Sequence, residues 1–355
     1  MQSSRPVTRL SEQAAIHTYF DVVPESPDGT HVTYFAFDCK PLAHGTVMIS
    51  ERDGTNAVAV TACPGHPHTG AHQGWLDNEH INFSAEGQVH VAERSGAIVQ
   101  QCSGAIDTLD QAQRRGLIHS GGLRKCGGQP EKEACWRVDL DSGEMVEVLD
   151  RETAAGVIAD AFDLSQVPDE SLTFKHTKWA PDGKSWFVVF NTLGYKKEHP
   201  ETPHIKVIIA ADEDGDDLRL IGSFGHHPNW LPDSSGIYAF AGRKTVVRWS
   251  ARGGEPETLA ELPCEGHPCV SPDGKRLACD GFGWPAEGQA GVVLRDLESG
   301  TTETLVEMDY PRVEWQTQHP PQQICHPHPV WSHDGRRLYL NAIEGELPAF
   351  YAMDL

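Results

Sequence analysis

Histidine recurs in this sequence at one fixed offset from a turn. In five segments an imidazole stands six positions before the Asp, or in one copy the Asn, of a turn motif. The pairs are His72 with Asn78, His176 with Asp182, His227 with Asp233, His267 with Asp273 and His328 with Asp334. In a repeat architecture, an equal offset means an equivalent place in each structural unit. The spacing therefore predicts imidazoles that gather in space, where they can bind a metal ion or transfer protons.

The last copy, Gln323-Ile-Cys-His326-Pro-His328, is the richest in potential ligands. Side chains alternate along an extended strand, so His326 and His328 are expected on the same side. With His267 from the neighbouring repeat and the amide oxygen of Gln323, they form a set of three nitrogens and one oxygen. This set suits Mn²⁺, with Fe²⁺, Ni²⁺ and Zn²⁺ as competitors. A structural alternative stays open, in which each imidazole bonds a backbone carbonyl and the following Pro stiffens the chain.

The other members of the histidine column have two open interpretations. His72, His176 and His227 either face a central channel, in catalysis or substrate binding, or support the fold. His226 is expected to point away from His227 and to be structural. Gly65-His-Pro-His68 is a second His-x-His pattern, which we assign to a loop rather than to a ligand set. Arg243 and Lys196 belong to exposed basic pairs that could hold a substrate carboxylate. Tryptophans three positions after the histidines are expected to pack between repeats: Trp75, Trp179, Trp230 and Trp331.

Turn motifs define the elements that must position these side chains. Pro-Asp-Gly or a close variant precedes an apolar strand at 26–29, 180–183, 231–236, 271–274 and 332–335. Pro presets φ, Asp bonds its own backbone and Gly allows positive φ, so each copy is a tight hairpin turn. Second turns follow within each repeat, which gives about four short strands per repeat. That is one blade of a β-propeller.

The sequence therefore predicts an all-β fold, a single-domain (1–355) seven-bladed β-propeller with four-stranded antiparallel blades. The blades are expected near 22–62, 72–102, 117–150, 173–221, 225–262, 265–306 and 326–355. The last blade is one strand short, and residues 14–20 are expected to supply that strand and close the ring. Helical periodicity is confined to 105–115.

Composition narrows the class of protein. The 355 residues carry 29 basic and 51 acidic side chains, a formal charge of −22, which argues against nucleic acid or an anionic membrane as partner. Nine cysteines without a CxxC pair, no apolar leader and no long apolar run favour a reduced cytoplasmic protein. GxSxG, P-loop and dinucleotide motifs are absent from the sequence. The oligomeric state has no signature.

Three segments resemble the oligogalacturonate lyase family of polysaccharide lyases: Gly225–Trp230, Gly266–Gly274 and Gln323–Gly335. The repeats alone also resemble the less specific Tol-type propeller repeats. Members of the lyase family are cytosolic seven-bladed propellers that use Mn²⁺ to cleave short uronate oligosaccharides by β-elimination. The resemblance implies His267, Gln323, His326 and His328 as metal ligands and His227 as a candidate base. We add His176 as the second candidate. The family's active-site arginine has no counterpart in the stretch 190–197, which offers lysines.

The expected chemistry follows from these parts. The metal withdraws charge from the C6 carboxylate of a small acidic oligosaccharide, and a neutral imidazole removes the C5 proton. Two other functions compete with this hypothesis. One is a propeller that acts only as an interaction scaffold. The other is a metal-dependent hydrolase or lactonase that uses the same histidines to activate water.

Overall fold

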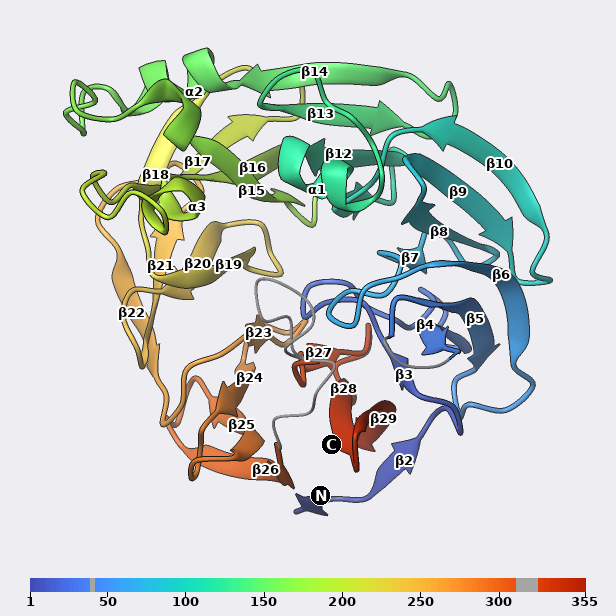
Figure 1. Ribbon diagram of the computed structural model, residues 1–355. Helices are drawn as coiled ribbons and strands as arrows, with labels where there is room; N and C mark the ends of the chain where they lie inside the picture. Colours follow the sequence, from blue (N-terminus) through green and yellow to red (C-terminus); the bar gives the residue numbers. More distant parts are fainter. Residues whose placement is uncertain (39–41, 311–324) are drawn as a thin grey trace. The chain divides into compact units, whose positions relative to one another are not determined.

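Short antiparallel sheets make up almost all of the regular structure. The computed structural model describes residues 1–38, 42–310 and 325–355. Within these residues the strands form seven sheets, in each of which consecutive strands are neighbours (Figure 1). Six of the sheets have four strands and one has five. This is the fold of a seven-bladed β-propeller with four-stranded antiparallel blades, as predicted. The helices of the described residues are too short or too polar to cross a lipid bilayer.

The contacts divide the chain into two compact units, each described here by itself. The first unit comprises Met1–Glu86, His90–Gln101 and Ala260–Leu355, and the second comprises Gly87–Val89 and Cys102–Leu259. The first unit holds a sheet of four strands, β3 (Ala15–Ile16), β4 (His31–Phe37), β5 (His44–Glu51) and β6 (Val58–Pro64). It also holds most of a second sheet, which consists of β7 (Gly74–Trp75), β8 (His80–Ala85), β9 (Gln88–Glu93) and β10 (Ile98–Ser103).

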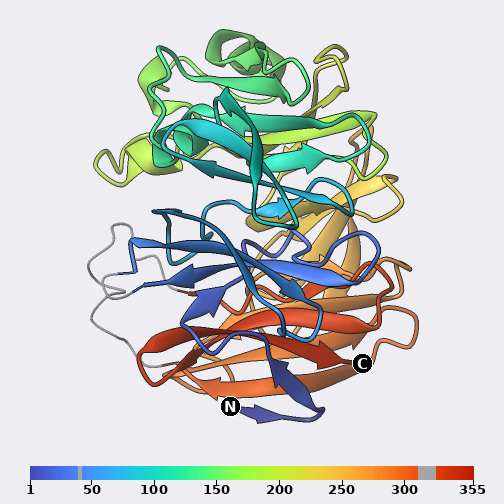
Figure 2. The same cartoon turned by 90° about the vertical axis from the view of Figure 1, so that its right-hand side faces the viewer.

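Two further sheets of the first unit combine the two ends of the sequence. One consists of β23 (Pro268–Val270), β24 (Arg276–Phe282), β25 (Gln289–Asp296), β26 (Thr302–Asp309) and β1 (Gln2–Ser3). The other consists of β27 (Val330–Trp331), β28 (Arg337–Glu344), β29 (Leu347–Asp354) and β2 (Val7–Arg9). Figure 2 shows the dark blue N-terminal strands beside orange and red strands from the other end of the chain.

An N-terminal strand thus completes the last blade, but the segment differs from the predicted one. β2 pairs with β29, Thr8 opposite Ala352, whereas Ala15 and Ile16 pair with β4 as part of the first sheet. The prediction that residues 14–20 supply the missing strand is therefore wrong. Ala15 and Ile16 are completely buried, and burial of this apolar pair in the first sheet outweighs pairing at an exposed edge.

The second unit contains three sheets and all three α-helices. The first sheet consists of β11 (Thr108–Asp110), β12 (Arg115–His119), β13 (Ala134–Asp139) and β14 (Met145–Asp150), and the second of β15 (Thr173–Trp179), β16 (Ser185–Asn191), β17 (Lys206–Asp212) and β18 (Arg219–Ser223). The third consists of β19 (His226–Trp230), β20 (Gly236–Phe240), β21 (Thr245–Ser250) and β22 (Glu257–Glu261). The last two residues of β22 belong to the first unit. The helices α1 (Ser120–Lys125), α2 (Arg151–Ile158) and α3 (Leu193–Lys196) and a 3₁₀ turn (Asp169–Ser171) are insertions.

The predicted turn chemistry is present in the hairpins. Asp182 and Asp334 each accept a hydrogen bond from the backbone N–H two residues later, at 3.0 and 2.9 Å. Gly183 has a φ of 70°, while in the variant turn at 231–236 the left-handed residue is Ser234, with a φ of 61°. The helical periodicity at 105–115 did not yield a helix, because this stretch forms β11 and a turn. α2 instead begins after Asp150, whose side chain accepts from Thr153 N.

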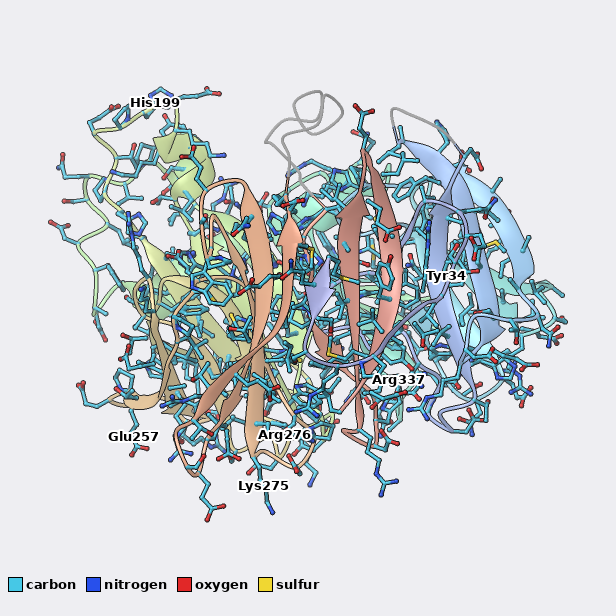
Figure 3. All side chains as sticks on the ribbon, turned by 90° about the horizontal axis from the view of Figure 1, so that it is seen from below. Tyr34, His199, Glu257, Lys275, Arg276 and Arg337 are labelled. Atoms are coloured by element: carbon cyan, nitrogen blue, oxygen red, sulfur yellow. The ribbon has the colours of Figure 1, made fainter. Side chains whose placement is uncertain are left out.

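Tryptophan and arginine side chains join neighbouring sheets within each unit. The indole N–H of Trp331 donates to the Cys269 carbonyl at 2.9 Å, and that of Trp230 donates to the Lys178 carbonyl at 3.1 Å. The guanidinium of Arg276, labelled in Figure 3 beside Lys275, lies 4.6 Å from the Trp331 ring centre. Apolar strand residues form separate cores in the two units. The tryptophans therefore pack between repeats, as expected from their spacing.

Candidate metal centre and histidine sites

Four histidines of the first unit meet in one cluster. His68 lies in the loop after β6, His267 directly precedes β23, and His326 and His328 precede β27. One ring nitrogen of each lies within 4.8 Å of the corresponding atom of every other. The ring centre of His328 lies 4.4 Å from that of His267 and 4.6 Å from that of His68. Such a group of nitrogen donors from three separate chain segments is the arrangement that a transition metal ion requires.

His328 shows most clearly that the cluster suits a cation. Its side chain is completely buried, and neither ring nitrogen has a hydrogen-bond partner among the described residues. Burial, followed by the neighbouring histidines, holds the pKa of His328 well below its usual value. The ring is therefore neutral near pH 7 and offers a lone pair. A buried polar group without a partner costs about 1–3 kcal/mol, which a coordinated metal ion would offset.

Four of the five histidines in the column share an unusual backbone conformation. His72, His176, His227 and His328 have φ values of 52°, 49°, 54° and 45°, in the left-handed region that non-glycine residues seldom adopt. Strand pairing is irregular at two of these positions, between Lys175 and Lys178 and between His226 and Asn229. Strained residues of this kind concentrate at ligand sites. The equal offsets thus correspond to an equivalent local structure at four of the five positions, and His267, whose φ is not positive, is the exception.

The route by which His326 and His328 meet differs from the one expected. Both lie before β27 rather than within a strand, and the left-handed turn at His328 breaks the alternation of side chains. Their ring centres are nevertheless 5.5 Å apart. The expectation that strand alternation places the two rings together was therefore wrong in its reason, although the two rings are close.

A buried carboxylate fixes two of the four histidines. Asp280 in β24 is completely buried and lies 3.0 Å from Nδ1 of His267. The backbone N–H of His267 donates to the same oxygen at 2.5 Å, and that of His328 donates to the other oxygen at 3.0 Å. Burial raises the pKa of Asp280 to about 7. A carboxylate on Nδ1 fixes the tautomer so that Nε2 carries the lone pair, and it orients the ring, as around many metal sites.

Aromatic side chains enclose the cluster. The ring of Tyr19 lies 4.7 Å from that of His328, and the ring of Phe20 lies 5.1 Å from that of His267. The ring of Phe282 lies 4.0 Å from that of His326, tilted by 35°. Tyr19, Phe282, His68 and His326 are partly exposed, whereas His267 and His328 are buried. The buried half of the cluster, at His267 and His328, therefore lies in an apolar environment of low dielectric constant. Solvent reaches the other half, at His68 and His326.

A second group of histidines lies in the second unit. His176 in β15 has its pKa held well below the usual value, first by burial and then by Lys178, His119 and His227. His119 caps α1 and lies 3.8 Å from the carboxylate of Asp107. The rings of His226 and His227 in β19 are 5.6 Å apart. The two residues predicted to act as bases, His227 and His176, are thus electrostatic neighbours in one unit.

The remaining predicted site residues are placed as follows. His72 lies beside Thr69, with Nε2 3.2 Å from its hydroxyl. The ammonium of Lys196 donates to the carbonyls of Pro200 and Thr202, within its own loop. Arg243 is exposed between β20 and β21. The predicted ligand Gln323 lies outside the described residues.

Two residues of the metal centre were not assigned from the sequence. His68 lies in a loop, as predicted, but it also belongs to the histidine cluster, which the sequence analysis did not expect. Its Gly65-His-Pro-His68 pattern repeats the His-Pro-His of residues 326–328 and is the signal that could have found it. Asp280 interrupts the apolar run Leu277–Cys279 of a buried strand. An acidic residue at such a position needs a partner, and this is the signal that could have found it.

The fold and the site define the class of this chain as a β-propeller with a histidine cluster able to hold a metal. No family model and no curated protein sequence matches the chain. Among solved structures it is similar to an oligogalacturonate lyase in complex with manganese, with a TM-score of 0.70, 18% identity and coverage of 100% of this chain and 94% of the other. The oligogalacturonate lyase of Vibrio parahaemolyticus gives the same TM-score and identity, with 100% and 95% coverage. The WD40 repeats of RRP9 follow, with a TM-score of 0.56, 9% identity and full coverage of both chains.

These likenesses concern the fold. At 18% identity the chain resembles oligogalacturonate lyases in the arrangement of its strands over its full length. The four-histidine cluster is an independent observation on this chain itself. The comparisons thus establish the propeller fold, and the chain's own histidines form a group that could hold a metal ion.

Proposed function

We propose that this protein is a metal-dependent lyase that cleaves short uronate oligosaccharides by β-elimination. The observation that carries the proposal is the histidine cluster around His328, a buried imidazole with two unsatisfied nitrogens among the described residues. The similarity in fold to oligogalacturonate lyases supports the choice of reaction. The substrate is a small acidic oligosaccharide such as an oligogalacturonate.

The donor set fits a divalent transition metal, and Mn²⁺ is the ion we propose. His68, His267, His326 and His328 would hold it, and Gln323, the oxygen ligand predicted from the sequence, remains a proposed ligand. A bound divalent cation would supply positive charge to the C6 carboxylate of a uronate and so acidify the proton on C5. The ion would also provide a local attraction for an anionic substrate in a chain whose formal charge is −22.

The chain's own residues perform the remaining steps. Asp280 keeps Nε2 of His267 available as a donor by bonding its Nδ1. His227, with His176 as the second candidate, accepts the C5 proton in its neutral form. The electrons of the C5–H bond form the C4–C5 double bond, and the glycosidic oxygen leaves C4 with its bonding electrons. His72, Lys196 and Arg243 remain the proposed contacts to the substrate.

The proposal is tested by incubating the purified full chain with digalacturonate and Mn²⁺. β-Elimination creates a conjugated unsaturated uronate, whose ultraviolet absorbance rises with time. We expect activity in the wild type, loss after chelation with EDTA, and loss in His328→Ala. The His199→Ala variant is the matched control and should keep full activity, because this side chain is 44% exposed and is not part of the four-histidine cluster. New reducing ends without an increase in absorbance would indicate a hydrolase and would refute the lyase.

A reducing compartment, the cytoplasm, is the proposed location. All eight described cysteines are free thiols, and seven of them are buried. Burial raises the pKa of Cys126 to about 12 and that of Cys63 to about 11, so these thiols stay protonated and inert near neutral pH. Expression with a secretion signal should therefore lower the yield of protein with free thiols, which titration with a thiol reagent would measure.

A further inference from the structure

Four lysines gather at one end of the sheet β15–β18 in the second unit. Lys175 lies in β15, and Lys206 begins β17. Lys197 directly follows α3, the helix that begins two residues after the end of β16. Lys125 ends α1, which packs against β15. The strand register places Asn191 opposite both Thr173 and Lys206, so that these elements share one end of the sheet.

These ammonium groups repel one another and have no acidic partners. The pKa of Lys206 is lowered to about 8, first by burial and then by Lys175. The pKa of Lys175 is also lowered, by burial and then by Lys125 and Lys197. Among the residues that the structure describes, no carboxylate forms an ion pair with any of these four lysines. Like charges held together without counter-charges are unfavourable unless an anion joins them.

Two carboxylates that bond to β15 have partners other than these lysines. Asp107 accepts hydrogen bonds from the backbone and hydroxyl of Thr177, at 3.1 and 3.3 Å. Glu133 accepts from the Phe174 N–H at 2.9 Å and pairs with Arg124 at 3.2 Å. Neither acid is therefore free to neutralise the lysines. In a protein with 51 acidic side chains, a basic group without acidic partners is a distinct local feature.

The lysine group is also built into the fold rather than loosely distributed. The ammonium of Lys206 donates to the carbonyl of Gly225 and lies 4.8 Å from the ring centre of Phe224. Gly225 directly precedes β19, which carries His226 and His227. Lys125 also contributes to the lowered pKa of His176. The positive charges thus lie at the end of the unit that holds the predicted base residues.

We propose that Lys125, Lys175, Lys197 and Lys206 form a binding site for the carboxylate of an acidic sugar. The site needs no metal, and it recognises a sugar unit by its negative charge. The choice of a uronate as ligand rests on the proposed function, whereas the anion site itself rests on the four lysines. Charge-assisted hydrogen bonds from ammonium to carboxylate are the interaction by which it binds.

The test uses the full chain freed of metal with EDTA, so that binding is separated from catalysis. Digalacturonate is titrated by calorimetry, with the neutral disaccharide galactobiose and inorganic phosphate as the two comparison ligands. We expect digalacturonate to bind at least about tenfold more tightly than galactobiose, and Lys175→Gln to weaken it about tenfold. Lys175→Arg should largely restore binding. Lys184→Gln is the matched control, because Lys184 is exposed at the opposite end of the same sheet.

Each alternative outcome has a defined meaning. Equal binding of galactobiose, or unchanged digalacturonate binding in both Lys175→Gln and Lys125→Gln, overturns the proposal. These two exposed positions decide the matter even if Lys206→Gln, which removes contacts to Phe224 and Gly225, fails to fold. Binding of phosphate alone, with the same dependence on lysine, overturns the carboxylate assignment. Lysine-dependent uronate binding without any elimination would refute the proposed function and leave this site intact.

Discussion

The substitution Asp280→Asn separates metal binding from stability. Asp280 accepts hydrogen bonds from the His267 ring, the His267 N–H and the His328 N–H. Asn keeps the shape but offers only one acceptor oxygen, and its amide group faces an N–H donor. Loss of a partner behind a metal-bound histidine typically weakens metal affinity 10- to 100-fold, or about 1.4–2.8 kcal/mol. We expect a weakening of Mn²⁺ binding in this range, measured by competition with a chelator of known affinity.

The stability of the metal-free protein should respond differently. Burial raises the pKa of Asp280 to about 7, so this group stabilises the metal-free fold below about pH 4 and loses that contribution as the pH rises through 7. At pH 8 the substitution removes a buried charge and also loses about 1 kcal/mol of hydrogen bonding. Because removal of the buried charge outweighs the lost hydrogen bonds, we expect the free energy of unfolding of metal-free Asp280→Asn at pH 8, measured by urea denaturation, to equal or exceed that of the wild type.

The matched control is Glu25→Gln, which removes another buried carboxylate of the first unit, one that pairs with Arg52 at 2.7 Å. It should destabilise the fold without changing the Mn²⁺ affinity of the folded protein. If Asp280→Asn binds Mn²⁺ within twofold of the wild type while His328→Ala does not bind it, Asp280 does not position the ligands and the reasoning is refuted.

Three further predictions concern metal, pH and packing. Mn²⁺ at 100 times its dissociation constant should stabilise the wild type by about 2.7 kcal/mol in thermal unfolding, and His328→Ala should lose this gain. Burial lowers the pKa of His17 to about 4, so its contribution is complete above pH 6.5 and falls by up to about 3 kcal/mol as the pH drops to 4. In His17→Gln the free energy of unfolding, measured by urea denaturation, should fall less steeply between pH 6.5 and pH 4 than in the wild type. Trp331→Phe should cost about 1–2 kcal/mol more than Trp179→Phe, because Trp331 Nε1 donates to a carbonyl while Trp179 Nε1 has no partner among the described residues.

The controls are chosen from the same chain. The His199→Gln variant, which replaces a side chain that is 44% exposed, should keep the acid sensitivity of the wild type. Equal slopes for His17→Gln and the wild type would contradict the second prediction. The two tryptophans of the third are matched, since each has an arginine over its ring, at 4.6 Å for Trp331 and 4.4 Å for Trp179. Equal losses from the two substitutions would show that the indole hydrogen bond contributes little. A stabilisation by Mn²⁺ that persists in His328→Ala would place the ion elsewhere.

Features encoded by neighbouring residues were predictable from the sequence. The hairpins follow from Asp182 and Gly183 and their equivalents, because the side-chain hydrogen bond and the positive φ are local. Repetition of these turns gave the number and approximate limits of the blades. That His176 and His227 occupy equivalent places in their repeats could be predicted, because both stand six positions before the turn Asp. The positive φ that they share could not.

Features that depend on distant residues were not predictable. Pairing of β2 with β29 joins Val7 to Met353, and nothing in the exposed segment 7–9 marks it more strongly than the apolar segment 14–20. Convergence of His68 with His267 depends on loops rather than on strand periodicity. The bonds from Asp280 to both His267 and His328 connect three chain segments. The sequence marks such residues as unusual without showing their partners.

Pairing of β2 with β29 has a consequence for synthesis on the ribosome. Residues 7–9 are synthesised long before their partners, 351–353, because more than 300 residues separate the two segments. Until 351–353 are made, β2 has no strand to pair with. Until β2 pairs with it, the outer edge of β29 has no hydrogen-bonded neighbour. Contacts between residues so distant in the chain form slowly. The final blade should therefore be the last to acquire protection from amide hydrogen exchange during refolding.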